Sequence, residues 1–462
     1  MLSRKIIHSI LLILSIAHFT SCSLNVPPPD LYSDPDAITN GKAARSLLAS
    51  CYLLYPHVEY ELSTLGNDFC LTSYSGKDVA QQNLYLWQDN SISSFSSDAW
   101  ASYYNCIANC DVLLDRISKA KSASPADSVS LQQTEAEAKT LKAMAYFDLL
   151  RLFSSPYDTK DDNLGIVIKS RTGVETVARS SKTACVEYIG NLLKDAIGVK
   201  NSPTANGWLS ARAATYLMAE LSLYSGNDKD AAHYAQMLID DCKPEYISKQ
   251  NYSRIWGTTS CEGRIFAMNI NTSFYSGIQY STDGDYFALN PKLQFDEADA
   301  RKAWTVYNKN ILGTERELVG KYNKLNKENA NINYVNRMRW AGAYFIAAEA
   351  YARMQQDDVA IATINVYLLA IGAQPLDNSL RGDALVKAIL HEKYKEFAGE
   401  GQNYYDLKRV HTDKLNRLGT WGASNRSFIN KDDYRWTFPI PASEYRYNEA
   451  VTQNEGWPIN RD

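Results

Sequence analysis

Histidine chemistry has little support in this sequence. Outside the first 21 residues, the only histidines are His57, His233, His391 and His411. His391 and Glu392 begin like a zinc-protease motif, but Lys395 occupies the position of the second histidine ligand. Neither a Gly-x-Ser-x-Gly nucleophile elbow nor a phosphate-binding glycine-rich loop occurs. The sequence therefore predicts no catalytic residue, no metal site and no cofactor.

Carboxylates are the remaining candidates for catalysis, because a glycosidase needs two of them about 5 to 10 Å apart across a cleft. Glu392, Glu396 and Glu400 are spaced four residues apart, next to Lys393 and Lys395. This spacing is typical of an ordinary ion-paired helix face. The sequence leaves a catalytic pair elsewhere open.

Aromatic side chains are a second kind of functional candidate. Sugar rings present flat C–H faces, so a glycan site needs exposed Trp or Tyr rings flanked by amide and carboxylate groups. The chain has 31 Tyr and 9 Trp. Two stretches, 59–95 and 243–336, combine such rings with Ser, Asn and Gly and have only weak periodicity, which is typical of loops and short strands.

The predicted ligand-contact residues lie in these two stretches. They are Trp87, Asp89 and Asn90 in the first, and Trp256, Tyr275, Tyr280, Asp283, Tyr286 and Trp304 in the second. Ala303 and Val306 beside Trp304 also suit a packed helix, and each ring has the alternative of being buried under its own loop. If the rings of Trp87 and Trp256 are exposed, their removal leaves the thermal stability nearly unchanged.

The N-terminus has the order of an export signal. Arg4 and Lys5 precede a mainly apolar run over 6–19, which is too short for a transmembrane helix, and Ser21-Cys22 follows. A small residue before a cysteine at this place indicates a bacterial lipobox, with Cys22 as the acylated first residue of the mature chain. Ordinary secretory cleavage near Ser21 is the alternative. We therefore expect residues 1–21 to be removed.

Composition excludes further kinds of site. The formal net charge of −4 provides no basic surface for nucleic acid. The seven cysteines after Cys22 show no zinc-type spacing, and their pairing stays open. Cys106 and Cys110 lie four residues apart on a predicted helix, where a disulfide is geometrically awkward. We expect both to be small buried residues.

Helical patterns frame the chain. Apolar residues at helical spacing predict helices over about 39–54, 97–119, 135–153, 183–199 and 383–410. Two other segments match at an offset of 129 residues, and each is followed by a polar turn, as in a tetratricopeptide hairpin. The matching residues are Ala214, Leu217, Met218 and Leu221 in the first and Ala343, Ile346, Ala347 and Ala350 in the second. We expect a mostly α fold in which residues 22–462 form a single domain that merges an N-terminal part, about 22–200, with a C-terminal part, about 201–462.

Four ordered blocks resemble the SusD/RagB lipoproteins of Bacteroidetes. The first two are Trp100-x3-Tyr104-x2-Ile107 with Cys110-Asp111, and the run from Tyr146 to Phe153 with Pro156-Tyr157. The third is Glu392-Lys393-x2-Glu396-Phe397-x2-Glu400-Gly401 with Tyr405-Asp406-Leu407-Lys408-Arg409, and the fourth joins Phe438-Pro439-Ile440-Pro441 to Gln453-Asn454-x-Gly456-Trp457. Asp111, Ser154 and Asn403 depart from the residues usual in the family, Asn403 by replacing an arginine of an ion pair.

The resemblance implies four tetratricopeptide-like helix pairs beneath an irregular ligand-binding face. It also implies a non-enzymatic protein, lipid-anchored to the outer membrane and exposed at the cell surface. Such a protein captures glycan, or in some relatives peptide, for a SusC-like TonB-dependent barrel. An enzyme and a pure protein-interaction scaffold remain the alternatives, and the fold alone does not identify the ligand.

Overall fold

The structure is a computed structural model that describes most of the chain between residues 38 and 459. The residues outside the description are 1–37, 39, 72–78, 121, 158–163, 170–171, 174, 200–202, 204, 253, 272–286, 312, 324–327, 330, 412–413, 419–427 and 460–462.

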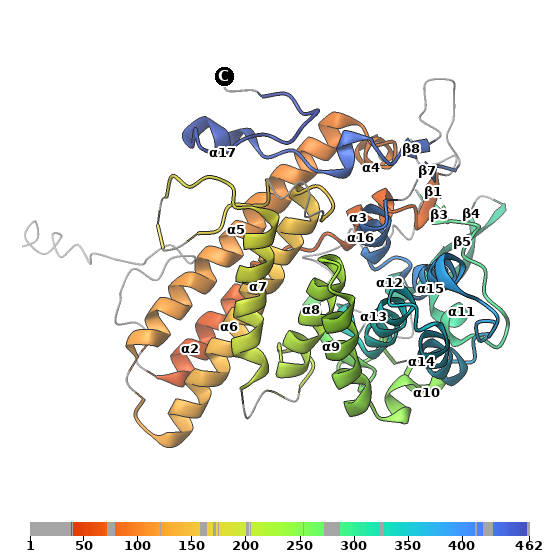
Figure 1. Ribbon diagram of the computed structural model, residues 1–462, viewed down its shortest axis with the longest axis horizontal. Coiled ribbons are helices and arrows are strands. Elements are labelled where there is room, and N and C mark those ends of the chain that lie inside the picture. The colour runs from red at the N-terminus through yellow and green to blue at the C-terminus, as the bar shows by residue number, and fades with distance from the viewer. Residues whose placement is uncertain are drawn as a thin grey trace, which may run out of the picture.

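Helices make up most of the described chain, as the sequence predicts, and short strands complete it (Figure 1). The α-helices are α2 (Gly41–Leu53), α3 (Glu59–Leu65), α4 (Val79–Tyr85), α5 (Asp89–Lys119), α6 (Pro125–Phe153), α7 (Lys182–Ile197), α8 (Ala211–Tyr224), α9 (Asp228–Asp241), α10 (Lys249–Tyr252), α11 (Ala300–Thr305), α12 (Gly320–Asn323), α13 (Trp340–Arg353), α14 (Asp357–Ala370), α15 (Gly382–Phe397), α16 (Gln402–Arg409) and α17 (Ala442–Tyr447). The 3-10 helices are η3 (Pro244–Ile247) and η5 (Tyr434–Trp436).

The described strands form four two-stranded antiparallel sheets. β1 (Phe69–Leu71) pairs with β3 (Phe287–Leu289), and β2 (Arg264–Asn271) pairs with β6 (Ile332–Arg339). β4 (Val306–Ile311) and β5 (Thr314–Val319) form a hairpin, and β7 (Lys414–Asn416) pairs with β8 (Phe428–Asn430). Several of these strands lie together at the upper right of Figure 1, beside α15.

The long helices α5 and α6 pack against each other and against α2 (Figure 1). The Ser124 side chain accepts a hydrogen bond from the amide of Asp127 (3.2 Å), and Pro125 occupies the first turn of α6. These two features are typical of a helix start and explain why α6 begins before the predicted residue 135. Cys106 and Cys110 are buried in α5, as predicted.

The two predicted hairpins are present and stack on each other. The ends of α13 and α14 each lie 129 residues after the corresponding ends of α8 and α9. Small residues such as Ala214 of α8 and Ala347 of α13 are fully buried, and α9 packs against α13. The pattern of residue sizes therefore predicts the repeat correctly.

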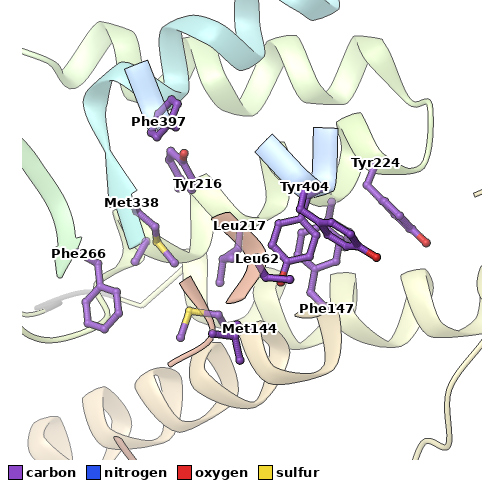
Figure 2. Packing of buried hydrophobic residues seen from close by; sticks show 14 of the residues in the cluster. Leu62, Met144, Phe147, Tyr216, Leu217, Tyr224, Phe266, Met338, Phe397 and Tyr404 are labelled. Atoms are coloured by element: carbon purple, nitrogen blue, oxygen red, sulfur yellow. The ribbon is translucent and has the colours of Figure 1, made fainter. Parts of the chain in front are cut away.

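One hydrophobic core joins early and late parts of the chain. Figure 2 shows Met144 of α6, Tyr216 of α8, Met338 of β6, Phe397 of α15 and Tyr404 of α16 in the same cluster. The helices of the two parts are therefore packed around shared side chains.

The prediction of loops and short strands over 59–95 is wrong for most of the stretch. It contains α3, α4 and the start of α5, and the short strand β1 is the part that agrees with the prediction. α3 and α4 are seven residues each, too short to give a periodic apolar signal. In the second stretch, 243–336, the described residues do form short helices and strands.

The single helix predicted over 383–410 is interrupted. α15 ends at Phe397 and α16 begins at Gln402, with Gly399 (φ +79°) and Gly401 (φ +75°) between them. A Cβ at Gly401 would lie 3.0 Å from the Glu59 Cα, so the turn requires both the left-handed backbone and the close approach of α3.

Two glutamates at the end of α15 and in the turn after it are more deeply buried than a surface ion-paired face would be. Glu396 and Glu400 are at most 1% exposed. Arg339, at the end of β6, pairs with both of them, at 2.5 Å to Glu396 and 2.8 Å to Glu400, and Lys321 donates to Glu400 at 2.6 Å. Their four-residue spacing therefore serves to join α15 to β6 and α12.

Asn403, which replaces the arginine expected from the resemblance, forms a hydrogen bond in place of an ion pair. Its side-chain amide donates to the Gly66 carbonyl. Nearby, the buried Asp68 carboxylate accepts from the amide of Gly399 (2.9 Å). Burial raises the pKa of Asp68 to about 7.

Candidate functional site

A sharp turn at Trp87 joins α4 to α5. The Trp87 amide donates to the Leu84 carbonyl and the Gln88 amide to the Asn83 carbonyl, each at 2.9 Å. These are the two bonds of a Schellman cap, and Trp87 occupies its left-handed position with φ +54°, where glycine is usual. The turn directs the Trp87 ring into the core, while Gln88 and Asp89 remain exposed.

A surface hollow of about 580 Å³ lies at this turn. Its wall consists of polar side chains from both sides of the turn and from η5: Asn83, Gln88, Asp89, Asn90, Ser91, Tyr434 and Arg435. We call it the polar hollow. Its amides, carboxylate, hydroxyls and guanidinium offer both donors and acceptors, the combination that a polyhydroxylated ligand requires.

The η5 segment fixes one wall of the polar hollow. The Tyr434 hydroxyl donates to Asp89 Oδ2 at 2.8 Å. The Arg435 guanidinium donates to the Trp87 carbonyl at 3.0 Å, pairs with Asp433 and lies 3.4 Å from Asp89 Oδ1. Because Asp433 and the carbonyl hold Arg435 in place, the Asp89 carboxylate is positioned and yet 53% exposed.

The structure brings two of the predicted site residues together, Asp89 and Asn90, both exposed at the polar hollow. Trp87, predicted to stack on ligand beside them, is 0% exposed. The centre of its ring lies 4.6 Å from that of Trp436, in an edge-to-face arrangement, and 6.2 Å from that of Tyr404. The prediction of an exposed Trp87 face is therefore wrong, because the left-handed turn separates this ring from the residues that follow it.

Trp256 and Trp304 are also buried, at 0% and 8% exposure, so the prediction of exposed faces is wrong for both. The Trp256 ring lies 6.1 Å from that of Trp304. The Lys321 ammonium is 4.9 Å and the Arg339 guanidinium 5.3 Å from the Trp256 ring centre. This ring therefore packs against the buried cations that also bind Glu396 and Glu400.

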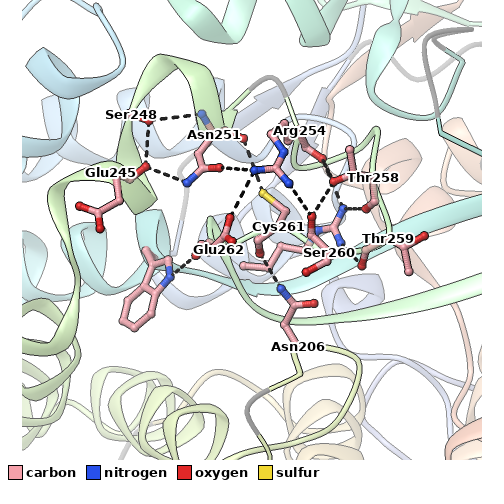
Figure 3. Close-up of polar contacts among 12 residues, drawn as sticks. Asn206, Glu245, Ser248, Asn251, Arg254, Thr258, Thr259, Ser260, Cys261 and Glu262 are labelled. Carbon is pink, nitrogen blue, oxygen red and sulfur yellow. Dashed lines mark hydrogen bonds and ion pairs between the residues drawn. The ribbon is translucent and has the colours of Figure 1, made fainter.

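Polar contacts hold the segment on either side of Trp256, as Figure 3 shows for residues 245–262. The Asn251 side chain donates to the Glu245 carbonyl (2.8 Å), and Arg254 donates to Asn251 Oδ1 (3.4 Å) and to the Ser260 carbonyl (3.2 Å). Trp256 is thus a buried residue of an ordered segment and not an exposed ring.

Four of the predicted contact residues, Tyr275, Tyr280, Asp283 and Tyr286, lie outside the described residues, as does the predicted lipidation site Cys22. They stay predictions.

Sequence reasoning missed Tyr434 and Arg435. They are 345 and 346 residues from Asp89 along the chain. No local pattern predicts that contact. The nearest signal is that both residues lie within four positions before the Phe438-Pro439 block.

Neither a metal cluster nor a membrane-spanning helix is found in the described part of the chain. Among these residues, no three His, Cys, Asp or Glu side chains are grouped to hold a metal ion. No described helix is both long and apolar enough to cross a bilayer.

The stacked hairpins define a tetratricopeptide-like helical protein. A family model described as the SusD family matches residues 194–457, and a second model, described as starch-binding and associating with the outer membrane, matches residues 30–202. Since the first model covers more than half of the chain, this protein belongs to the SusD family. The resemblance carried by the four sequence blocks is confirmed.

Solved structures agree with this assignment at the level of the fold. A SusD superfamily protein from Bacteroides thetaiotaomicron is 23% identical, with a TM-score of 0.75 over 90% of this chain and 99% of its own. One from Bacteroides vulgatus is 19% identical, with a TM-score of 0.78 over 91% and 100%. Surface glycan-binding protein A from Bacteroides uniformis is 19% identical, with a TM-score of 0.69 over 89% and 99%. A search of curated proteins found no match.

Proposed function

We propose that this protein captures glycan at the cell surface, in the polar hollow, and passes it to a SusC-like TonB-dependent outer-membrane transporter. The observation that carries the proposal is the arrangement of Asp89, Asn90, Tyr434 and Arg435 around one open hollow. Carboxylate, amide, phenol and guanidinium groups together match the alternating donors and acceptors of saccharide hydroxyls. The starch-binding description of the second family model supports a glycan over other polar ligands.

The site chemistry favours binding over catalysis. Among the described residues, Asp89 is the only carboxylate that lines the polar hollow. A glycosidase needs two carboxyl groups, one of them protonated to act as the acid. We therefore propose a binding protein with no turnover.

A binding screen tests the proposal. Protein lacking residues 1–22 is titrated against neutral polysaccharides, their oligosaccharides and a set of oligopeptides. We expect saturable binding of at least one glycan and no cleavage of it, measured by calorimetry and by chromatography of the recovered glycan. Binding of peptides alone would contradict the glycan assignment, and shortened products would contradict the absence of catalysis.

We also propose that acylated Cys22 anchors the protein in the outer membrane. More than one acyl chain is needed for stable attachment, which a triacylated cysteine provides. In cells without the partner barrel, Cys22→Ala should be exported and partition into the aqueous phase on detergent phase separation, while wild type enters the detergent phase. Recovery of the variant in the detergent phase would contradict a lipid anchor at this residue.

A further inference from the structure

A second hollow, of about 590 Å³, lies along the exposed face of α15. The side chains that α15 contributes are spaced at i, i+3, i+4, i+7, i+8 and i+11, which places them on one helical face. They are Asp383, Val386, Lys387, Leu390, His391 and Tyr394. We call this hollow the α15 groove. It is separate from the polar hollow, because the two share no lining residue.

The opposite wall of the α15 groove is formed by α16 and β7. Leu407 and Val410 of the α16 region are half-buried, and Leu415 of β7 is buried. The amide side chains of Asn403 and Asn416 also line the groove. The groove therefore combines an apolar floor with groups that donate and accept hydrogen bonds.

Cations outnumber carboxylates in the α15 groove. Lys292, Arg353, Lys387 and Lys414 line it, against Asp383 and Asp406. Asp406 is already neutralised by Lys393 at 2.7 Å and Arg409 at 2.9 Å, and Arg353 is paired with Glu349 at 2.7 Å.

The remaining lysines are available to a ligand. Lys292 and Lys387 are exposed, and within the described ranges neither forms an ion pair with a carboxylate. Lys414 lies 3.8 Å from the centre of the Phe428 ring. In a chain whose formal net charge is −4, this local excess of positive charge attracts anionic ligands.

We infer that the α15 groove is a second ligand site, which binds a saccharide that carries carboxylate groups. Exposed lysines supply the charge for the carboxylates, while Asn403, Asn416 and His391 supply partners for hydroxyl groups. The aliphatic floor and the Tyr394 ring pack against the C–H faces of a sugar. A volume of about 590 Å³ is in the range of small-ligand sites. The saccharide nature of the ligand rests on the proposed function, whereas its charge follows from the groove alone.

Calorimetric titration with trigalacturonate tests the inference, using protein that lacks residues 1–22 and carries D89A/N90A, so that ligand binding at the polar hollow does not contribute. A neutral galactose trisaccharide and a hexapeptide of alternating Glu and Leu are the comparison ligands. We expect trigalacturonate to bind, more weakly as the salt concentration rises, and the neutral trisaccharide to bind at least tenfold more weakly. The double variant K292A/K387A should lower the affinity for trigalacturonate roughly tenfold or more, because charge-assisted contacts are lost.

Two control variants separate the groove from general effects of charge. Lys139→Ala removes a lysine of α6 that is ion-paired with Glu135 and Asp195 and does not line the groove, and it should leave the affinity unchanged. Lys387→Arg keeps the charge and should retain most of the binding.

Three results would overturn the inference: equal binding of the neutral trisaccharide, binding of the acidic peptide but not of trigalacturonate, or trigalacturonate binding that K292A/K387A leaves intact. Loss of neutral glycan binding at the polar hollow is a different result, measured with different ligands and variants, and would overturn only the proposed function.

Discussion

Trp256→Ala is expected to lower the free energy of unfolding by about 3 to 5 kcal/mol, the cost of removing a large buried ring. The ring is fully buried, its centre lies 5.3 Å from that of the Tyr252 ring, and two buried cations pack against it. Its removal leaves a cavity beside Lys321 and Arg339. The lost stability therefore includes the packing of both cations against the ring. Chemical denaturation monitored by circular dichroism measures the change.

Trp208→Ala is the matched control for that experiment, because Trp208 is only partly buried and stacks with Arg45 at 4.0 Å on a more open part of the surface. We expect it to cost clearly less than Trp256→Ala. A Trp256→Ala variant as stable as wild type would show that this ring is exposed in solution, as the sequence-based prediction has it.

Arg337→Met is expected to have an effect of similar size, about 3 to 5 kcal/mol, because it leaves buried carboxylates without their cation. Arg337 lies 2.7 Å from Asp148 Oδ2 and 3.3 Å from Glu59 Oε1, and both carboxylates are at most 1% exposed. Although burial opposes it, Arg337 and Arg151 lower the pKa of Asp148.

The effect of Arg337→Met should depend on pH. A carboxyl whose pKa is lowered in the folded state contributes stability above its unfolded pKa of about 3.9, and that stability is lost as the pH falls. The difference in the free energy of unfolding between wild type and Arg337→Met should therefore be larger at pH 7 than at a pH below about 4.

Arg212→Met serves as the control for the arginine variant. Arg212 pairs with Asp241, and both side chains are nearly half exposed, at 47% and 48%. An exposed pair of this kind contributes at most about 1 kcal/mol. Equal losses for the two variants, or a loss from Arg337→Met that does not change with pH, would contradict a buried ion network at Asp148.

Much of the fold follows from sequence patterns. The 129-residue repeat gives α8, α9, α13 and α14 because small residues recur at helical spacing on the faces that meet. The α15–α16 break is also encoded, in Gly399 and Gly401, but the unbroken apolar spacing around them conceals it. The short helices α3 and α4 have no such signal, since a segment of seven residues spans only about two turns.

The candidate site was predictable only in part, for physical reasons. Asp89 and Asn90 are polar residues at the first turn of a long helix, and their exposure follows from their position. The direction of the Trp87 ring depends on one left-handed backbone angle, which sequence spacing does not reveal. Tyr434 and Arg435 reach the polar hollow through contacts with Asp89 and Trp87, which are distant in the sequence and are brought close only by the packing of the core.

The affinity of the D89A/N90A double variant for the glycan selected by the binding screen tests the central claim most directly. Both side chains are exposed, so the variant should remain folded with a thermal midpoint close to that of wild type. Lys139→Ala, on α6 away from the polar hollow, is the control and should bind as wild type does. If the polar hollow binds the glycan, the double variant loses affinity by about tenfold or more, since contacts to a carboxylate and an amide are removed. Unchanged affinity in a folded variant would contradict the account and place the glycan site elsewhere.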